Sequence, residues 1–216
     1  MIRYSFKIFC VAFSACFCCA GSLLAEDNNP HTDKMMNEKL NLTQEWDKVF
    51  PKSDKVTHRK VSFRNRYGIM LAADLYMPRN VNEKLPAIAV SGPFGAVKEQ
   101  SAGLYAQTMA ERGFLTIAFD PSYTGESGGF PRYVASPDIN TEDFCAAVDY
   151  LSTRDDVDSE RIVIIGICGW GGMAVNAAAI DTRIKATVTS TMYDMSRVNA
   201  NGYFDAKDAD ARYELR

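Results

Sequence analysis

Cys168 stands at the tip of a glycine-rich turn. Residues 161–180 read RIVIIGICGWGGMAVNAAAI, so four β-branched residues run into the turn and an alanine-rich segment follows it. A sharp strand-to-helix turn built from small residues presents one side chain outward, toward a site above the turn. A thiol in that position is suited to nucleophilic attack on a carbonyl carbon. Cys168 is therefore a candidate nucleophile.

Strand-like and helix-like segments alternate around this turn. Apolar runs predict strands at 85–91, 114–119, 161–165 and 184–190, and periodic apolar residues predict helices at 102–109, 141–154 and 171–180. Because the strands alternate with helices and are apolar on both faces, they indicate a mainly parallel sheet that is covered by helices on both sides. Two earlier runs, 56–63 and 69–76, are joined by Asn-Arg-Tyr-Gly and predict an N-terminal hairpin. The predicted fold class is α/β.

Three loops follow the carboxyl ends of these strands, where functional residues of such sheets lie. They read SGPFGAVKEQ at 91–100, DPSYTGESGG at 120–129 and GICGWGG at 166–172. Their order resembles the α/β-hydrolase superfamily, closest to its dienelactone hydrolase-like branch, over residues 56–193. The resemblance implies an esterase-like hydrolase that acts on a small ester, lactone or related acyl substrate and uses no cofactor and no metal.

The same resemblance implies roles for individual residues of these loops. Cys168 becomes the nucleophile, with an elbow around it formed by Gly166, Trp170, Gly171 and Gly172; Trp170 departs from the small residue usual at its position. The implied oxyanion donors are the backbone N–H groups of Gly169 and of Phe94 or its neighbour Gly95. A plain turn is the alternative for the SGPFG loop.

The loop at 120–129 leaves two interpretations open. Glu126 and Ser127 either line the pocket or belong to a solvated loop.

A base for the nucleophile is harder to find. A catalytic triad of this kind places its acid and histidine after the nucleophile, but both histidines, His31 and His58, precede Cys168. His31 belongs to the N-terminal leader. His58 belongs to the first predicted strand, four strand positions from the nucleophile strand, or roughly 19 Å at about 4.8 Å per strand. We therefore expect a chain that ends before the family's acid and histidine and is inactive by itself.

Two alternatives belong to other functional classes. One is a non-catalytic binding remnant of the fold. The other is a dinucleotide-binding protein, because Gly169, Gly171 and Ala174 match G-x-G-x-x-A and Asp194 lies about 20 residues further on. That fingerprint normally belongs to the first βα unit of its domain, whereas this turn follows a hairpin and two earlier strand and helix units.

The sequence also divides along its length. Residues 1–25 have a basic start and an apolar run, which predicts a signal peptide and an exported protein, either periplasmic or secreted. FSAC, ending at Cys16, resembles a lipoprotein cleavage box and leaves lipidation as an alternative. Residues 26–54 are predicted to form a polar leader with a short helix at 35–49, residues 55–190 the hydrolase core, and residues 191–216 the start of a cap segment.

Charge and cysteine content limit the partners. A net charge of -3 and a pI near 5.5 give no basic surface for nucleic acid, so we expect a small-molecule acyl substrate. Four of the six cysteines lie in the predicted signal, and Cys145 fits the apolar face of a helix, which predicts an inert core residue. No stable membrane span is expected after signal cleavage, and the oligomeric state stays open.

Overall fold

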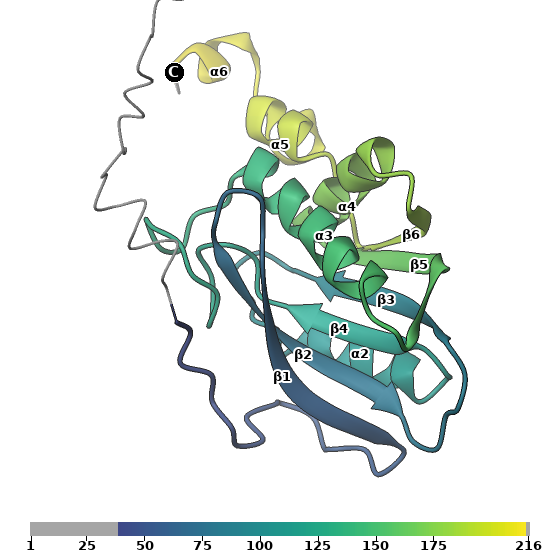
Figure 1. Cartoon of the computed structure of the whole chain (residues 1–216). Coiled ribbons are helices and arrows are strands. Elements are labelled where there is room, and N and C mark those ends of the chain that lie inside the picture. The colour runs from purple at the N-terminus through teal and green to yellow at the C-terminus, as the bar shows by residue number, and fades with distance from the viewer. Residues whose placement is uncertain (1–38, 215–216) are drawn as a thin grey trace, which may run out of the picture.

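The strands of the computed structural model form one mixed sheet, which is seen from one face in Figure 1. The structure describes residues 39–214. The strands are β1 (Val56–Arg64), β2 (Met70–Pro78), β3 (Leu85–Ser91), β4 (Leu115–Phe119), β5 (Val157–Ile167) and β6 (Ile184–Ser190). Their order in the sheet is β1-β2-β4-β3-β5-β6.

The strand directions confirm the predicted hairpin and mainly parallel sheet. β1 and β2 pair antiparallel, and β2 pairs antiparallel with β4. β4, β3, β5 and β6 are mutually parallel neighbours. In the hairpin turn, the Asn65 side chain accepts hydrogen bonds from the backbone N–H groups of Tyr67 and Ile69. The antiparallel strands therefore extend a parallel sheet whose carboxyl ends lie at one edge.

Helices cover both faces of this sheet, as the sequence predicts. α2 (Ser101–Ala110) packs on one face through Ala102 and Ala106. α3 (Pro137–Ser152) and α4 (Gly169–Ile180) pack on the other, with Phe144 and Ala174 in the larger core cluster. β3 and β4 are buried on both faces because helices cover each face of the sheet there.

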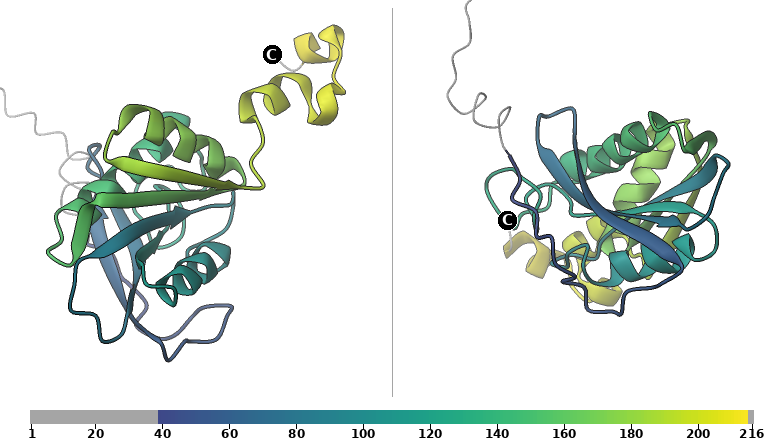
Figure 2. Two further views of the ribbon diagram at one scale, coloured as in Figure 1. Left: turned by 90° about the vertical axis from the view of Figure 1, so that its right-hand side faces the viewer. Right: turned by 60° about the horizontal axis from the view of Figure 1, so that its bottom comes forward.

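A further helical segment follows the last strand. It contains α5 (Met195–Asn201), the short 3-10 turn η1 (Tyr203–Asp205) and α6 (Ala209–Glu214), and it extends away from the sheet (Figure 2). Within residues 39–214, no helix has both the length and the apolar character that crossing a membrane requires.

The segment before β1 differs from its prediction. The helix expected at 35–49 is wrong for residues 39–49, which form no helix, and residues 35–38 lie outside the described part, as does the predicted signal. Residues of this segment also bond to the rest of the protein: the Val49 N–H donates to the Glu99 carbonyl at 3.2 Å, and Phe50 is buried. The predicted leader is thus packed against the sheet over its last residues.

Two predicted elements begin four residues earlier than expected. β5 begins at Val157 rather than at 161, and α3 begins at Pro137 rather than at 141. In both cases the added residues are largely polar, so the apolar pattern did not include them. Proline at the first helical position needs no N–H partner and is favourable there.

Candidate functional site

Cys168 joins β5 to α4 in a strained backbone conformation. Its φ is 58° and its ψ is -126°, a combination that costs about 1–3 kcal/mol for a residue other than glycine. Hydrogen bonds hold the turn on both sides: the Cys168 N–H donates to the Ser190 carbonyl at 2.8 Å, and the Gly171 N–H donates to the Cys168 carbonyl at 2.9 Å. The Cys168 side chain is half-buried at the carboxyl edge of the sheet.

Small residues are required at some elbow positions and not at others. A Cβ on Gly166 would lie 2.3 Å from the Trp170 carbonyl oxygen, so glycine is needed where β5 meets α4. A Cβ on Gly171 would meet Met192 at 2.8 Å, whereas one on Gly172 would meet nothing within 4 Å. The side chain of Trp170 is accommodated in a buried position.

Trp170 packs against the SGPFG loop instead. Its ring meets Phe94 edge to face at 4.6 Å between centroids, and Trp170 is buried. Gly92 has a φ of +99°, and a Cβ there would lie 2.4 Å from the Ile167 carbonyl oxygen. The loop after β3 therefore lies directly on the elbow, at a distance that only glycine permits.

The two predicted sources of oxyanion donors lie next to each other. Gly169 is the first residue of α4, so its N–H has no partner within the helix. The Phe94 ring lies so close to Gly169 that a Cβ on Gly169 would stand 1.9 Å from a Phe94 ring carbon. The structure thus brings Phe94, Gly169 and Cys168 together. The oxyanion role of these N–H groups remains a prediction.

A cavity of about 480 Å³ adjoins this contact. Its lining comes from the loops after β3 and β4 and from the elbow: Phe94, Gly95, Val97, Thr124, Gly125, Tyr133, Val134, Ala135 and Trp170. None of these side chains carries a charge at neutral pH. The cavity is therefore suited to an uncharged group.

Glu126 and Ser127 have neither of the roles that were left open for them. Both are absent from the cavity lining. The Ser127 hydroxyl donates to the Asp120 carbonyl at 2.7 Å and accepts from the Ala72 N–H at 2.8 Å. Glu126 binds two lysines, Lys60 and Lys98, at 2.7 and 2.8 Å. These side chains hold their loop in place.

Tyr193 is a site residue that the sequence analysis did not find. Hydrogen bonding with the Cys168 side chain, together with partial burial, raises the pKa of Tyr193 to about 12. Its ring lies 6.2 Å from that of Tyr203. The available signal was its position, because Tyr193 follows β6 and the carboxyl end of β6 lies beside that of β5.

No histidine lies near Cys168 in the described part of the chain. His58 is on β1, four places from β5 in the sheet, as predicted, and its Nε2 lies 2.7 Å from Asp74 Oδ1. His31 lies outside the described residues. Cys145 is buried on α3, and burial raises the pKa of its thiol to about 11. Residues 39–214 contain no group of histidine, cysteine and carboxylate side chains that could hold a metal ion.

Comparison with known proteins agrees with this architecture. Residues 67–214 match the model of the X-Pro dipeptidyl-peptidase (S15) family. The chain belongs to this family. It is 70% identical over 177 residues to the uncharacterized protein PA2218 of Pseudomonas aeruginosa, which covers 82% of this chain and 48% of that protein. The thiohydrolase aneE of Aspergillus aculeatus is 30% identical over 137 residues, which covers 63% of this chain and 42% of that protein.

Solved structures agree on the fold. The crystal structure of PA2218 superposes with a TM-score of 0.80 at 69% identity, over 82% of this chain and 56% of that one. A putative dienelactone hydrolase from Klebsiella pneumoniae has a TM-score of 0.51 at 21% identity, over 63% of this chain and 60% of that one. The predicted α/β-hydrolase fold is confirmed. The chain spans about half the length of the curated relatives it matches.

Proposed function

We propose that this chain carries the nucleophile of an acyl-transferring hydrolase, with Cys168 as the attacking group. The observation that carries the proposal is the elbow: a half-buried thiol at φ 58° and ψ -126°, between β5 and α4, at a helix N-terminus that no side chain caps. The Cys168 thiol gives up its proton as its sulfur attacks the substrate carbonyl carbon, and the N–H groups of Gly169 and of Phe94 or Gly95 stabilise the oxyanion. The bond to the alcohol or thiol then breaks, and this leaving group takes up the proton. A thioester of Cys168 remains, which water then cleaves.

The cavity and the relatives support the substrate class. The uncharged lining beside Trp170 suits the acyl part of a small ester, lactone or thioester. A relative is named a thiohydrolase, which is consistent with thioester cleavage. Family membership favours acyl transfer over the dinucleotide alternative.

Turnover is proposed only for a protein that also supplies a base. The one histidine among residues 39–214 is committed to Asp74 on the far side of the sheet. Sites that lose triad members keep about 10³–10⁴-fold over water from the oxyanion donors and binding. We therefore propose that the 216-residue chain becomes acylated at Cys168 but has negligible esterase turnover.

Mass spectrometry of the intact protein tests this. After incubation with p-nitrophenyl acetate, we expect one acetyl adduct that maps to Cys168, absent from Cys168→Ala and retained in the matched variant Cys145→Ala. An adduct that persists in Cys168→Ala would disprove the assignment of the nucleophile. Rapid turnover that Cys168→Ala abolishes would show that a base other than His58 acts at the site.

A second candidate is a non-catalytic binding protein, which the lack of a histidine beside Cys168 among residues 39–214 favours. It predicts that neutral esters bind in the cavity without acylating Cys168. Equilibrium binding of a neutral ester, with no adduct after prolonged incubation, would identify this alternative.

We also propose that the chain is exported, on the basis of the basic and apolar N-terminal sequence. Cell fractionation with N-terminal sequencing tests it. A cytoplasmic chain that begins at Met1 or Ile2 would contradict the proposal.

A further inference from the structure

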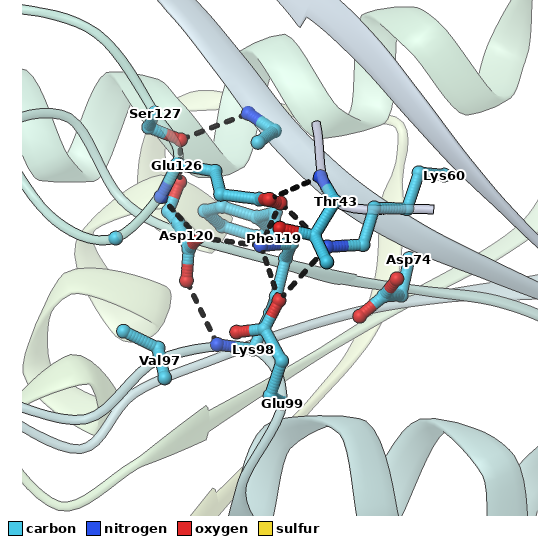
Figure 3. A network of polar contacts seen from close by, with 12 residues as sticks. Thr43, Lys60, Asp74, Val97, Lys98, Glu99, Phe119, Asp120, Glu126 and Ser127 are labelled. Carbon is cyan, nitrogen blue, oxygen red and sulfur yellow. Dashed lines mark hydrogen bonds and ion pairs between the residues drawn. The ribbon is translucent and has the colours of Figure 1, made fainter. Parts of the chain in front are cut away.

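A buried network of ion pairs lies beneath the two loops that line the cavity (Figure 3). Three lysines from three separate segments take part: Lys48 before β1, Lys60 on β1 and Lys98 after β3. The side chains of Lys48 and Lys98 are fully buried, and that of Lys60 is 4% exposed. The lysines meet carboxylates of Asp47, Asp74, Glu99, Asp120 and Glu126. Lysines are almost never fully buried unless they are paired.

Asp120 connects the two loops through this network. Its Oδ1 accepts from the backbone N–H of Lys98, in the loop after β3, at 2.8 Å. Its Oδ2 accepts from the backbone N–H of Glu126, in the loop after β4, at 2.9 Å, and from Lys98 Nζ at 2.8 Å. A Cβ on Gly125, which lines the cavity, would lie 2.2 Å from Asp120 Oδ2. One buried carboxylate thus fixes the backbone of both cavity walls.

Lys98 supplies the charge that this arrangement needs. Its ammonium group contacts Asp120, Glu126 and Glu99 at 2.8, 2.8 and 2.6 Å. Burial alone would lower the pKa of Lys98, but the charge of Asp120 and these hydrogen bonds outweigh burial and raise it above its usual range. Lys98 therefore remains a cation, four residues after Phe94 in the same loop.

The segment before β1 completes the network from outside. We call residues 43–53 the strap. The Thr43 N–H donates to Glu126 Oε1 at 2.7 Å, and the Val49 N–H donates to the Glu99 carbonyl at 3.2 Å. Asp47 Oδ2 lies 3.1 Å from Lys60 Nζ. At its far end the Ser53 N–H donates to Gln107 of α2 at 3.2 Å. The strap thus joins the network through Glu126 and Lys60 and contacts the loop after β3 through the Glu99 backbone carbonyl.

We propose that Lys98 and Asp120 are positioning residues that set the oxyanion loop and the cavity wall relative to Cys168, and that the strap holds them in that arrangement. The proposal rests on the proposed acyl-transfer function, because it concerns the geometry of that site. None of these side chains lines the cavity or contacts Cys168, so they act only through Phe94 and the residues beside it.

Two reactions of the same thiol separate positioning from simple damage to the fold. Acylation by p-nitrophenyl acetate needs a placed oxyanion donor, whereas alkylation by iodoacetamide needs only an accessible thiolate. In Lys98→Met, which removes the charge and keeps the length, we expect single-turnover acylation of Cys168 to fall about tenfold or more. Alkylation should stay within about twofold, because the thiol itself is untouched. The exposed Lys55→Met is the matched control and should change neither rate.

The strap is tested by Thr43→Pro, which removes one exposed N–H donor and leaves the buried charges in place. We expect a smaller loss of acylation and faster amide exchange at 92–100 and 121–129, with β3 and β4 still protected. If Lys98→Met does not fold, Thr43→Pro decides alone. An unchanged ratio of acylation to alkylation, with unchanged exchange in the loops, would overturn the proposal. Absence of acylation in the wild-type chain would instead refute the proposed function, and the exchange result would still decide the role of the network.

Discussion

At the scale of single residues, the two elbow glycines Gly166 and Gly172 should respond differently to an added methyl group. In Gly166→Ala, the new Cβ would lie 2.3 Å from a backbone oxygen, which cannot move without shifting α4. We expect a loss of about 1–3 kcal/mol, as for other overpacked positions. Gly172→Ala meets open space within the first turns of α4 and should stabilise the protein by up to about 1 kcal/mol. Urea denaturation of both variants measures the difference, and equal effects would contradict the local geometry.

Tyr193 offers a second prediction at this scale. Its pKa of about 12 arises first from hydrogen bonding with Cys168, which means that the protonated hydroxyl is favoured beside the sulfur. Tyr193→Phe removes this donor, and one such bond is worth about 0.5–1 kcal/mol. We expect alkylation of Cys168 at neutral pH to slow about two- to fivefold. Tyr213→Phe, in exposed α6, is the control, and equal rates in both variants would show that the hydroxyl does not act on the sulfur.

At the scale of elements, the sequence was most informative where local pattern and burial agree. The apolar, buried runs of β3 and β4 and the glycines around Cys168 predicted the strands and the turn correctly, because each signal lies within a few residues. The strap was not predicted. Its residues are polar, and Lys48 is buried only because Asp74, which is distant in sequence, lies 2.9 Å away. Tyr193 was also missed because its partner, Cys168, is distant in sequence and follows the neighbouring strand β5.

β6 leads to a prediction about association. Within the described residues it pairs with β5 alone, and Val188 is 49% exposed. Such an edge can pair with another chain. We expect the chain produced without residues 1–25 to associate with rising concentration, and Val188→Lys to weaken that association. Sedimentation velocity compares it with Val175→Lys on α4, which should have less effect; a wild-type chain that is monomeric at every concentration would contradict the expectation.

At the scale of the whole molecule, the ion-pair network makes stability depend on acid. Burial would raise the pKa values of Asp47 and Glu126, but hydrogen bonds from Lys60 and from Lys48 or Lys98 hold both at about 2. A carboxyl whose folded pKa is lowered stabilises the fold above its unfolded pKa, near 4, and loses that contribution as the pH falls toward 2. The urea concentration at the midpoint of unfolding should therefore decrease as the pH is lowered from 5 to 2.

Asp47→Asn isolates this effect. The Asp47 side chain is 29% exposed, so solvent screening limits its contribution to about 0.2–1 kcal/mol. We expect the variant to be less stable than the wild type at pH 7 and equal to it near pH 2. A difference that is the same at both pH values would assign the effect to packing rather than to charge.

Lys48 also determines where this protein can be cut and joined. The family match begins at residue 67, and the first strand begins at Val56. Both positions are natural choices for the first residue of a shortened chain. Both fragments discard the ammonium group beside the fully buried carboxylate of Asp74, and the later start also discards His58, the other partner of that carboxylate. Removing one partner of a buried ion pair costs about 3–5 kcal/mol. Fusion partners and affinity tags should therefore be attached before residue 39. A chimera that contains this sheet must also contain the strap.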